Sequence, residues 1–246
     1  MNASSSSSSS QFTAAAYKVA GDLHIVLIST GSVASVKIPL IVEELLKYQR
    51  VRIQVVATKA SLVFYNAQEL KEKHGVTVWQ DEDEWTASRM HRSWKKLSDP
   101  ILHIELRKWA DLVLVAPCSA NTLAKLAGGL CDNLATSLLR ALPPIQDVLQ
   151  SGATTEALEK SAAEDVRGGM QVWVFPAMNT MMYEHPLTAR HLSVVKEVLK
   201  YRVEGPIAKG LACGDVGIGA MTEWREIVNM VVHRYKLEPQ QVPIAE

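Results

Sequence analysis

Short, nearly continuous apolar runs alternate along this chain with segments whose apolar positions recur every three or four residues. The runs cover residues 23–29, 51–57, 111–117 and 171–176. Apolar runs of this length are typical of strands buried on both faces of a parallel sheet. Helical spacing follows the first run, at Ile38, Ile41, Val42 and Leu45. The pattern predicts one α/β domain over residues 21–236, Rossmann-like or flavodoxin-like, with helices on both sides of the sheet.

Further helices are predicted after the second and third strands, from about Pro186 to Lys200, and from Thr222 to about Tyr235. Pro39 is compatible with the helix that contains Ile38 and Leu45, because it falls in the opening turn of that helix, where no hydrogen bond is lost. The glycine-rich stretch 205–221 lacks a periodic face and is predicted to be a loop.

Four stretches fall outside this alternation. Residues 1–20 contain the serine run 4–10, which can bury almost nothing, so we expect a disordered tail there. Residues 74–100 form a charged insertion, predicted to be a solvated surface loop. A second insertion at 143–170 is rich in Ser, Ala and Glu, and a short tail follows at 237–246.

Polar turns follow the strands where helices begin. Ligands of open α/β sheets bind outside the carboxyl ends of the strands, which gives the candidate site Ser32, Ser61, Ser119, Asn121, Thr122 and Asn179. Backbone N–H groups and hydroxyls in such turns can hold a phosphate and a flavin-like ring. The same residue types are also ordinary helix N-caps, and both roles remain open.

The first turn argues against a dinucleotide. It contains Gly31 alone where the fingerprint needs three glycines, and the second strand ends at Thr58 without an acidic residue. A mononucleotide held through hydroxyl groups therefore remains.

Composition argues against several other classes of binding partner. Lys plus Arg equals Asp plus Glu at 26 each, so no surplus charge attracts nucleic acid. The three cysteines are far apart in sequence, which argues against a disulfide framework and a zinc site, and no metal is expected. No apolar run approaches the length of a membrane span, and no signal peptide is evident. We expect a cytoplasmic protein.

Five short motifs occur along the chain. They are Gly31-Ser32-Val33-Ala34, His103-Ile104-Glu105-Leu106 with Trp109-Ala110-Asp111, Ser119-Ala120-Asn121-Thr122, Pro176-Ala177-Met178-Asn179 and Leu211-Ala212-Cys213-Gly214-Asp215. Together they resemble the homo-oligomeric flavin-containing cysteine decarboxylases, including their halotolerance-type fungal relatives. The resemblance covers residues 21–236 without the insertions. Tyr183 departs from it, because the family has tryptophan there.

The resemblance implies FMN-dependent decarboxylation of 4′-phosphopantothenoylcysteine to 4′-phosphopantetheine and CO2 in coenzyme A synthesis. In the family's reaction the cysteine side is oxidised to a thioaldehyde, CO2 leaves, and the enethiol product is reduced again. His103 would be the acid/base group, although a histidine among apolar residues is otherwise more typical of packing. Asn179 would bind the substrate, and Cys213 would donate a proton to the enethiol.

By the same resemblance, FMN would contact Gly31, Ser32, Ser61, Phe64, Ser119, Asn121, Thr122 and Ala177. The substrate would contact Asn179, Lys209 and Ala212. The active site would form between the subunits of a homotrimer, with His103 of one chain facing Asn179 and Cys213 of its neighbour.

Other functions remain open on this fold. A regulatory subunit that inhibits a serine/threonine protein phosphatase is the main alternative, although residues 238–246 contain no long acidic run. A peptide-cysteine decarboxylase is disfavoured by Cys213. A flavin prenyltransferase is disfavoured by the Pro176–Asn179 and Leu211–Asp215 segments.

Overall fold

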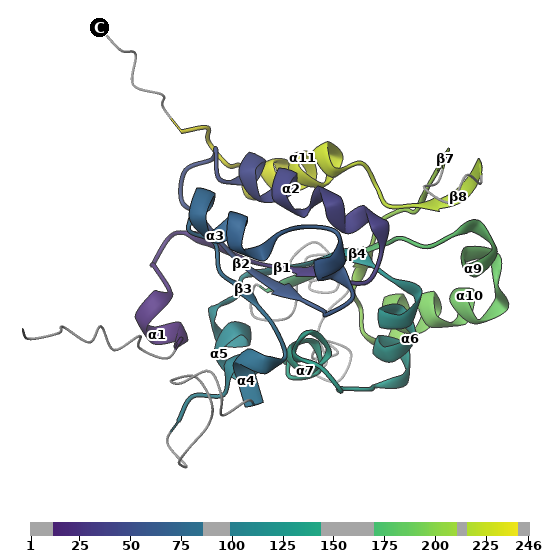
Figure 1. Ribbon diagram of the computed structural model, residues 1–246, viewed down its shortest axis with the longest axis horizontal. Helices are drawn as coiled ribbons and strands as arrows, with labels where there is room; N and C mark the ends of the chain where they lie inside the picture. Colours follow the sequence, from purple (N-terminus) through teal and green to yellow (C-terminus); the bar gives the residue numbers. More distant parts are fainter. Residues whose placement is uncertain (1–11, 86–98, 144–169, 211–215, 241–246) are drawn as a thin grey trace, which may run out of the picture.

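A parallel sheet lies between two layers of helices in the computed structural model, which describes residues 12–85, 99–143, 170–210 and 216–240 (Figure 1). In spatial order the six strands are β3 (Val78–Trp79), β2 (Val51–Ala57), β1 (Leu23–Ser29), β4 (Leu112–Cys118), β5 (Gln171–Pro176) and β6 (Arg202–Val203). The predicted α/β class is confirmed. The order 3-2-1-4-5-6 is that of the Rossmann type and reverses direction between β1 and β4.

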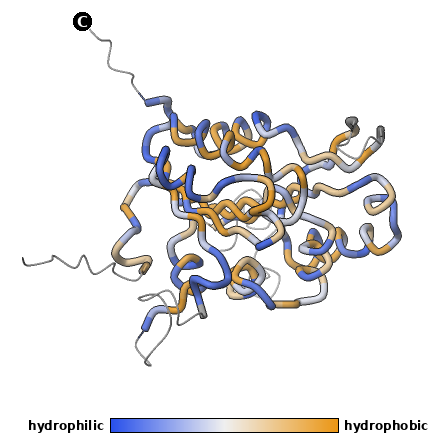
Figure 2. The backbone as a smooth tube through the Cα atoms, in the orientation of Figure 1, coloured by the Kyte–Doolittle hydropathy of each residue, from blue (hydrophilic) through white to orange (hydrophobic). Residues whose placement is uncertain are grey.

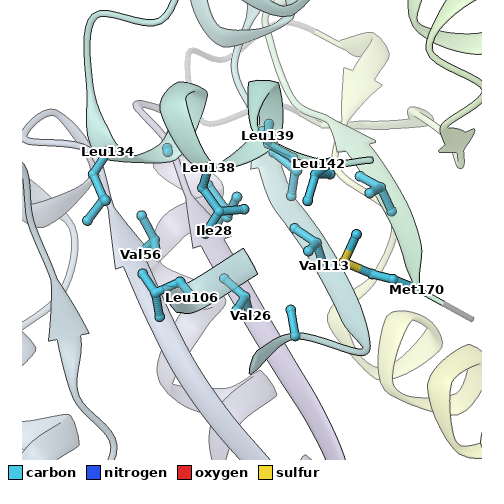
Figure 3. Packing of buried hydrophobic residues seen from close by; sticks show 14 of the residues in the cluster. Val26, Ile28, Val56, Leu106, Val113, Leu134, Leu138, Leu139, Leu142 and Met170 are labelled. Atoms are coloured by element: carbon cyan, nitrogen blue, oxygen red, sulfur yellow. The ribbon is translucent and has the colours of Figure 1, made fainter. Parts of the chain in front are cut away.

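Alternation along the buried strands assigns each helix layer to one face of the sheet. Ile25 and Leu27 of β1 belong to the cluster formed with α2 (Ile38–Leu45), α3 (Ala67–His74) and α11 (Trp224–Tyr235). Val26 and Ile28 face the other way, toward α5 (Leu102–Trp109), α6 (Ala120–Gly128) and α7 (Leu134–Arg140) (Figure 3). Figure 2 shows the resulting apolar interior, with hydrophilic residues on the outer helix surfaces. None of the described helices is long and apolar enough to cross a membrane.

An N-terminal arm, residues 12–22, packs against α5, so the folded part begins before the predicted boundary at residue 21. Phe12 is 7% exposed, and its ring stacks on Tyr17 at 5.1 Å and contacts Trp79 at 5.4 Å between centroids. The short helix α1 (Ala14–Tyr17) follows. The expectation of a disordered tail is therefore wrong for residues 12–20, because aromatic contacts and hydrogen bonds hold them against the fold, while the serine run lies outside the described residues.

Three residues of the predicted H-x-E-L and W-A-D motifs hold this arm. Glu105 Oε2 accepts a hydrogen bond from the Ala14 N–H at 2.8 Å, and the Trp109 indole N–H donates to Tyr17 O at 3.1 Å. Asp111 accepts hydrogen bonds from Lys18 at 2.9 Å and from the buried His24 ring at 2.7 Å. Burial raises the pKa of Asp111, but these hydrogen bonds outweigh it and hold the pKa below its ordinary value.

The charged insertion predicted as a solvated loop is partly built into the fold. Val78 and Trp79 form the edge strand β3, and α4 (Glu82–Trp85) follows directly. Asp83 and Glu84 are only 4% and 3% exposed, so the prediction is wrong for them. Residues 86–98 lie outside the described part of the chain.

The C-terminal third contains structure where the sequence predicted a loop. Strands β7 (Ile207–Gly210) and β8 (Val216–Ala220) form an antiparallel hairpin within the glycine-rich stretch. The predicted helix before it is divided into α10 (Pro186–Ser193) and the π-helical turn η4 (Val194–Val198), after the short helix α9 (Thr180–Glu184). Most of the second insertion, residues 144–169, is not described.

The chain stays attached beyond the predicted domain end at residue 236. The Gln49 N–H donates to Glu238 O at 2.8 Å, and the Gln240 N–H donates to Lys47 O at 2.7 Å. These bonds tie residues 237–240 to the end of α2, so only residues 241–246 of the predicted tail lie outside the described structure.

Candidate active site

A cavity of about 500 Å³ lies outside the carboxyl ends of β1, β4 and β5, beside the point where the strand order reverses. It is lined by Gly31, Ser32, Val33, Ala34, Val36, Lys37, Ser119, Ala120, Asn121, Ala177, Met178, Asn179, Met182, Gly219, Ala220, Met221, Thr222, Glu223 and Trp224. Six of the predicted site residues are among them: Gly31, Ser32, Ser119, Asn121, Ala177 and Asn179. The structure thus brings together turns that are far apart in the sequence.

The polar turns are helix N-caps as well as cavity walls. The Ser32 hydroxyl accepts from the Ala34 N–H at 3.4 Å at the start of the 3₁₀ turn η1 (Val33–Lys37). Ser119 Oγ accepts from the Thr122 N–H at 3.2 Å, and Asn179 Oδ1 accepts from the Met182 N–H at 2.9 Å. The amide NH2 of Asn179 is not used by its cap and remains available to a ligand.

Thr30 fixes the turn that contains Ser32 relative to the turn that contains Ser119. This residue was not among those predicted from the sequence. Its hydroxyl donates to Pro117 O at 2.7 Å and accepts from the Ser119 N–H at 2.8 Å. Thr30 is fully buried. The sequence shows that Thr30 lies at the end of the first apolar run. Its hydrogen-bond partners are distant in sequence and are known only from the fold.

The lining residues fit a flavin mononucleotide. Apolar walls from Met178, Met182 and Trp224 suit a flat ring, and the hydroxyls and backbone N–H groups of the turns suit a phosphate. Lys37 is the one cationic residue among the described lining, and it was also missed from the sequence. The cavity volume of about 500 Å³ is within the usual range for ligand cavities, which is roughly 300–1,000 Å³.

Three of the predicted FMN contacts do not line this cavity. Ser61 is fully buried, where its hydroxyl donates to Thr58 O at 2.8 Å and pairs with Ser29 Oγ at 2.9 Å. Thr122 is 3% exposed beneath Ser119. Phe64 lies at a separate surface depression that follows the 3₁₀ turn η2 (Ser61–Val63). These residues support or flank the site in the single chain.

His103 lies at the start of α5 and does not line the cavity in the single chain. Its ring forms a short hydrogen bond through Nδ1 with Glu84 Oε1. Glu84 could not be identified from the sequence because it is part of a charge run, which usually marks a solvated face.

The hairpin β7–β8 packs on the turn that carries Asn179. The Met178 N–H donates to Gly219 O at 2.9 Å, and a side chain at Gly219, whose φ is +154°, would place its Cβ 2.3 Å from Met178 O. The predicted residues Ala212 and Cys213 lie outside the described residues. Lys209 lies on β7, but its side chain is not described.

A larger hollow of about 820 Å³ lies at the opposite, amino-terminal edge of the sheet. Its charged lining residues largely pair with one another, as Lys18 does with Asp111 and Arg50 with Asp22. We assign the site to the smaller cavity, because it lies at the carboxyl edge of the sheet and contains six of the predicted site residues.

Comparison with known proteins gives one family and many relatives. The Flavoprotein family model matches residues 14–236. Phosphopantothenoylcysteine decarboxylase from Mus musculus is 42% identical over 203 residues, which are 82% of each chain. A probable thymidylate synthase from Schizosaccharomyces pombe is 42% identical over 89% of this chain, and coenzyme A biosynthesis protein 3 from Saccharomyces cerevisiae is 41% identical over 86%. This chain spans only 30% and 33% of the length of the latter two relatives.

Solved structures agree with these relatives. A cysteine-to-serine variant of PPC decarboxylase in complex with pantothenoylaminoethenethiol has a TM-score of 0.68 and 38% identity, over 87% of this chain and 99% of that chain. The FMN binding protein AtHal3 has a TM-score of 0.66 and 38% identity, over 87% and 97%.

Proposed function

This chain belongs to the Flavoprotein family, and from that membership we propose that it is an FMN-dependent decarboxylase. Its substrate is 4′-phosphopantothenoylcysteine, and it works in the cytoplasm in coenzyme A synthesis. The observation that carries the proposal is the cavity at the carboxyl ends of β1, β4 and β5, with Asn179 in its wall and strand β8 packed beside it. A relative of 42% identity that is named for this activity supports it.

In the proposed reaction, the cofactor and the residues of the site have different roles. FMN, when bound, supplies the electron acceptor that makes loss of CO2 feasible and later returns the electrons. Ser32, Ser119 and Asn121 hold the cofactor through hydroxyl and amide groups, and the free amide NH2 of Asn179 binds the substrate carboxylate. His103 accepts the thiol proton, and Cys213 donates a proton when the enethiol is reduced.

Absorption spectra of the purified, FMN-loaded protein test the proposal directly. Addition of 4′-phosphopantothenoylcysteine should bleach the flavin bands transiently, with release of CO2. Protein that binds no flavin, or that binds flavin without releasing CO2 from this substrate, contradicts the proposal. Inhibition of a protein phosphatase, the alternative left open by the sequence, needs no acid/base histidine, so a His103→Gln protein that still inhibits would separate the two functions.

We also propose that the active enzyme is a homotrimer whose sites lie between chains. Large apolar side chains remain exposed around the cavity of the single chain, among them Val33 at 48%, Met181 at 67% and Met182 at 50%. Exposed apolar groups in one region favour association with another protein surface. We propose that a neighbouring chain binds there and brings its His103 to the cavity.

Mixed trimers test this arrangement. His103→Gln lacks the acid/base group, while Asn179→Asp keeps a good N-cap for α9 but loses the amide donor. Each variant alone should be inactive. Co-expressed at equal levels, they should recover roughly a quarter of wild-type turnover, because one neighbouring pair in four carries both intact residues. Co-expression of His103→Gln with His103→Ala is the control, and equal failure of both mixtures would contradict shared sites.

A further inference from the structure

Glu84 meets His103 where α4 packs on the start of α5 (Figure 1). Glu84 Oε1 forms the short hydrogen bond with His103 Nδ1 and also accepts from the His103 backbone N–H at 3.4 Å. The Glu84 side chain is 2% exposed and the His103 side chain is 19% exposed. The carboxylate side of this pair is therefore shielded from water, while part of the histidine remains accessible.

Little else in the described structure neutralises Glu84. Its Oε2 atom is buried without a hydrogen-bond partner among the described residues, and His103 is its one ion-pair partner within them. Its surroundings add negative charge: the pKa of Asp81 is raised, first by burial and also by nearby Glu82, Asp132 and Glu84. A buried carboxylate with so few partners is costly. Among the described residues, His103 is the group on which this carboxylate can act.

The hydrogen bond determines which ring nitrogen carries the proton. An ionised carboxylate can only accept, so Nδ1 of a neutral His103 must be the donor and Nε2 must present its lone pair. None of the described residues hydrogen-bonds Nε2. We propose that Glu84 is a positioning residue, which keeps the proton of His103 on Nδ1 and thereby makes Nε2 the acceptor of the substrate's thiol proton.

This inference rests on the proposed function and adds one step to it. As the thiol S–H bond breaks, an Nε2–H bond forms and the ring becomes an imidazolium. The positive charge faces the Glu84 carboxylate, which stabilises it in a site shielded from water. No other proton donor or acceptor is required.

Glu84→Gln is the informative variant. The amide can still accept from Nδ1–H and from the helix N–H, so the fold should be preserved. It can also donate, so it no longer selects one tautomer, and it carries no charge. We expect kcat for CO2 release to fall roughly 10- to 100-fold, the range found for partners that orient histidine ligands. KM should be unchanged, because Glu84 does not touch the substrate. Asp83→Asn, a buried carboxylate on the same helix, is the matched control.

The tautomer itself provides a readout besides activity. In FMN-loaded, [15N]histidine-labelled protein, the His103 ring is assigned by its absence in His103→Gln. We expect a protonated Nδ1 and an unprotonated Nε2 in the wild type and in Asp83→Asn, and a mixture of tautomers in Glu84→Gln. A wild-type ring protonated on Nε2 overturns the inference, as does a Glu84→Gln protein with unchanged tautomer and kcat. Because the NMR spectrum is recorded without turnover, it determines the tautomer of His103 independently of the decarboxylase activity.

Discussion

Glutamine in place of His103 is expected to lower the rate of CO2 release by about 10²–10⁴-fold, the usual contribution of a general acid/base. The glutamine amide can still donate a hydrogen bond to Glu84, so the start of α5 should remain intact. Single-turnover CO2 release from the FMN-loaded protein is the measurement, with thermal unfolding as the check on folding.

Cys213→Ser is the matched comparison, because it removes a proton donor that acts later. That variant should release CO2 once per site and then accumulate the unreduced enethiol, whereas His103→Gln should release almost none. If His103→Gln keeps near wild-type release, the acid/base role is wrong. If both variants stop before CO2, the order of the two steps is wrong.

Gly219→Ala is expected to lower turnover by about 10²-fold, the effect of displacing reacting groups by roughly 1 Å. The added Cβ would lie 2.3 Å from Met178 O, and a φ of +154° is unfavourable for any residue with a side chain. Because the obstructing atom belongs to the backbone, rotation of a side chain cannot relieve the clash. The hairpin must move away from the turn that carries Asn179.

Gly75→Ala is the control for a glycine effect without displacement. Gly75 also has a positive φ, +68°, but an added Cβ there meets nothing within 4 Å. It should reduce the free energy of unfolding by about 1 kcal/mol and leave turnover unchanged. Equal turnover in the two variants would show that contact between the hairpin and the turn does not position the site.

The strongly apolar strands could be predicted because a strand buried on both faces consists of consecutive apolar residues. β1, β2 and β5 begin and end at the predicted residues. The carboxyl ends of β1, β4 and β5 also predicted much of the cavity, since parallel strands place the turns at Ser32, Ser119 and Asn179 along one edge.

The remainder depends on contacts between distant segments. The strand β3 has too few residues to show a period, and Glu84 looks like one more solvated acid until His103 is placed beside it. Gly217 and Gly219 resemble loop glycines, yet they belong to β8, where the chain passes too close to α9 and its preceding turn for a side chain. Such residues are explained by their neighbours in space.

The inner end of the N-terminal arm and the C-terminal residues 237–240 lie on the same side of the fold. Gly21, Leu237 and Glu238 line the hollow at the amino-terminal edge of the sheet, away from the carboxyl edge where the cavity lies. A domain joined after residue 240 would thus start away from the proposed catalytic cleft. This geometry is suited to multidomain polypeptides, and a linker for tagging or immobilisation can be attached at the C-terminal end.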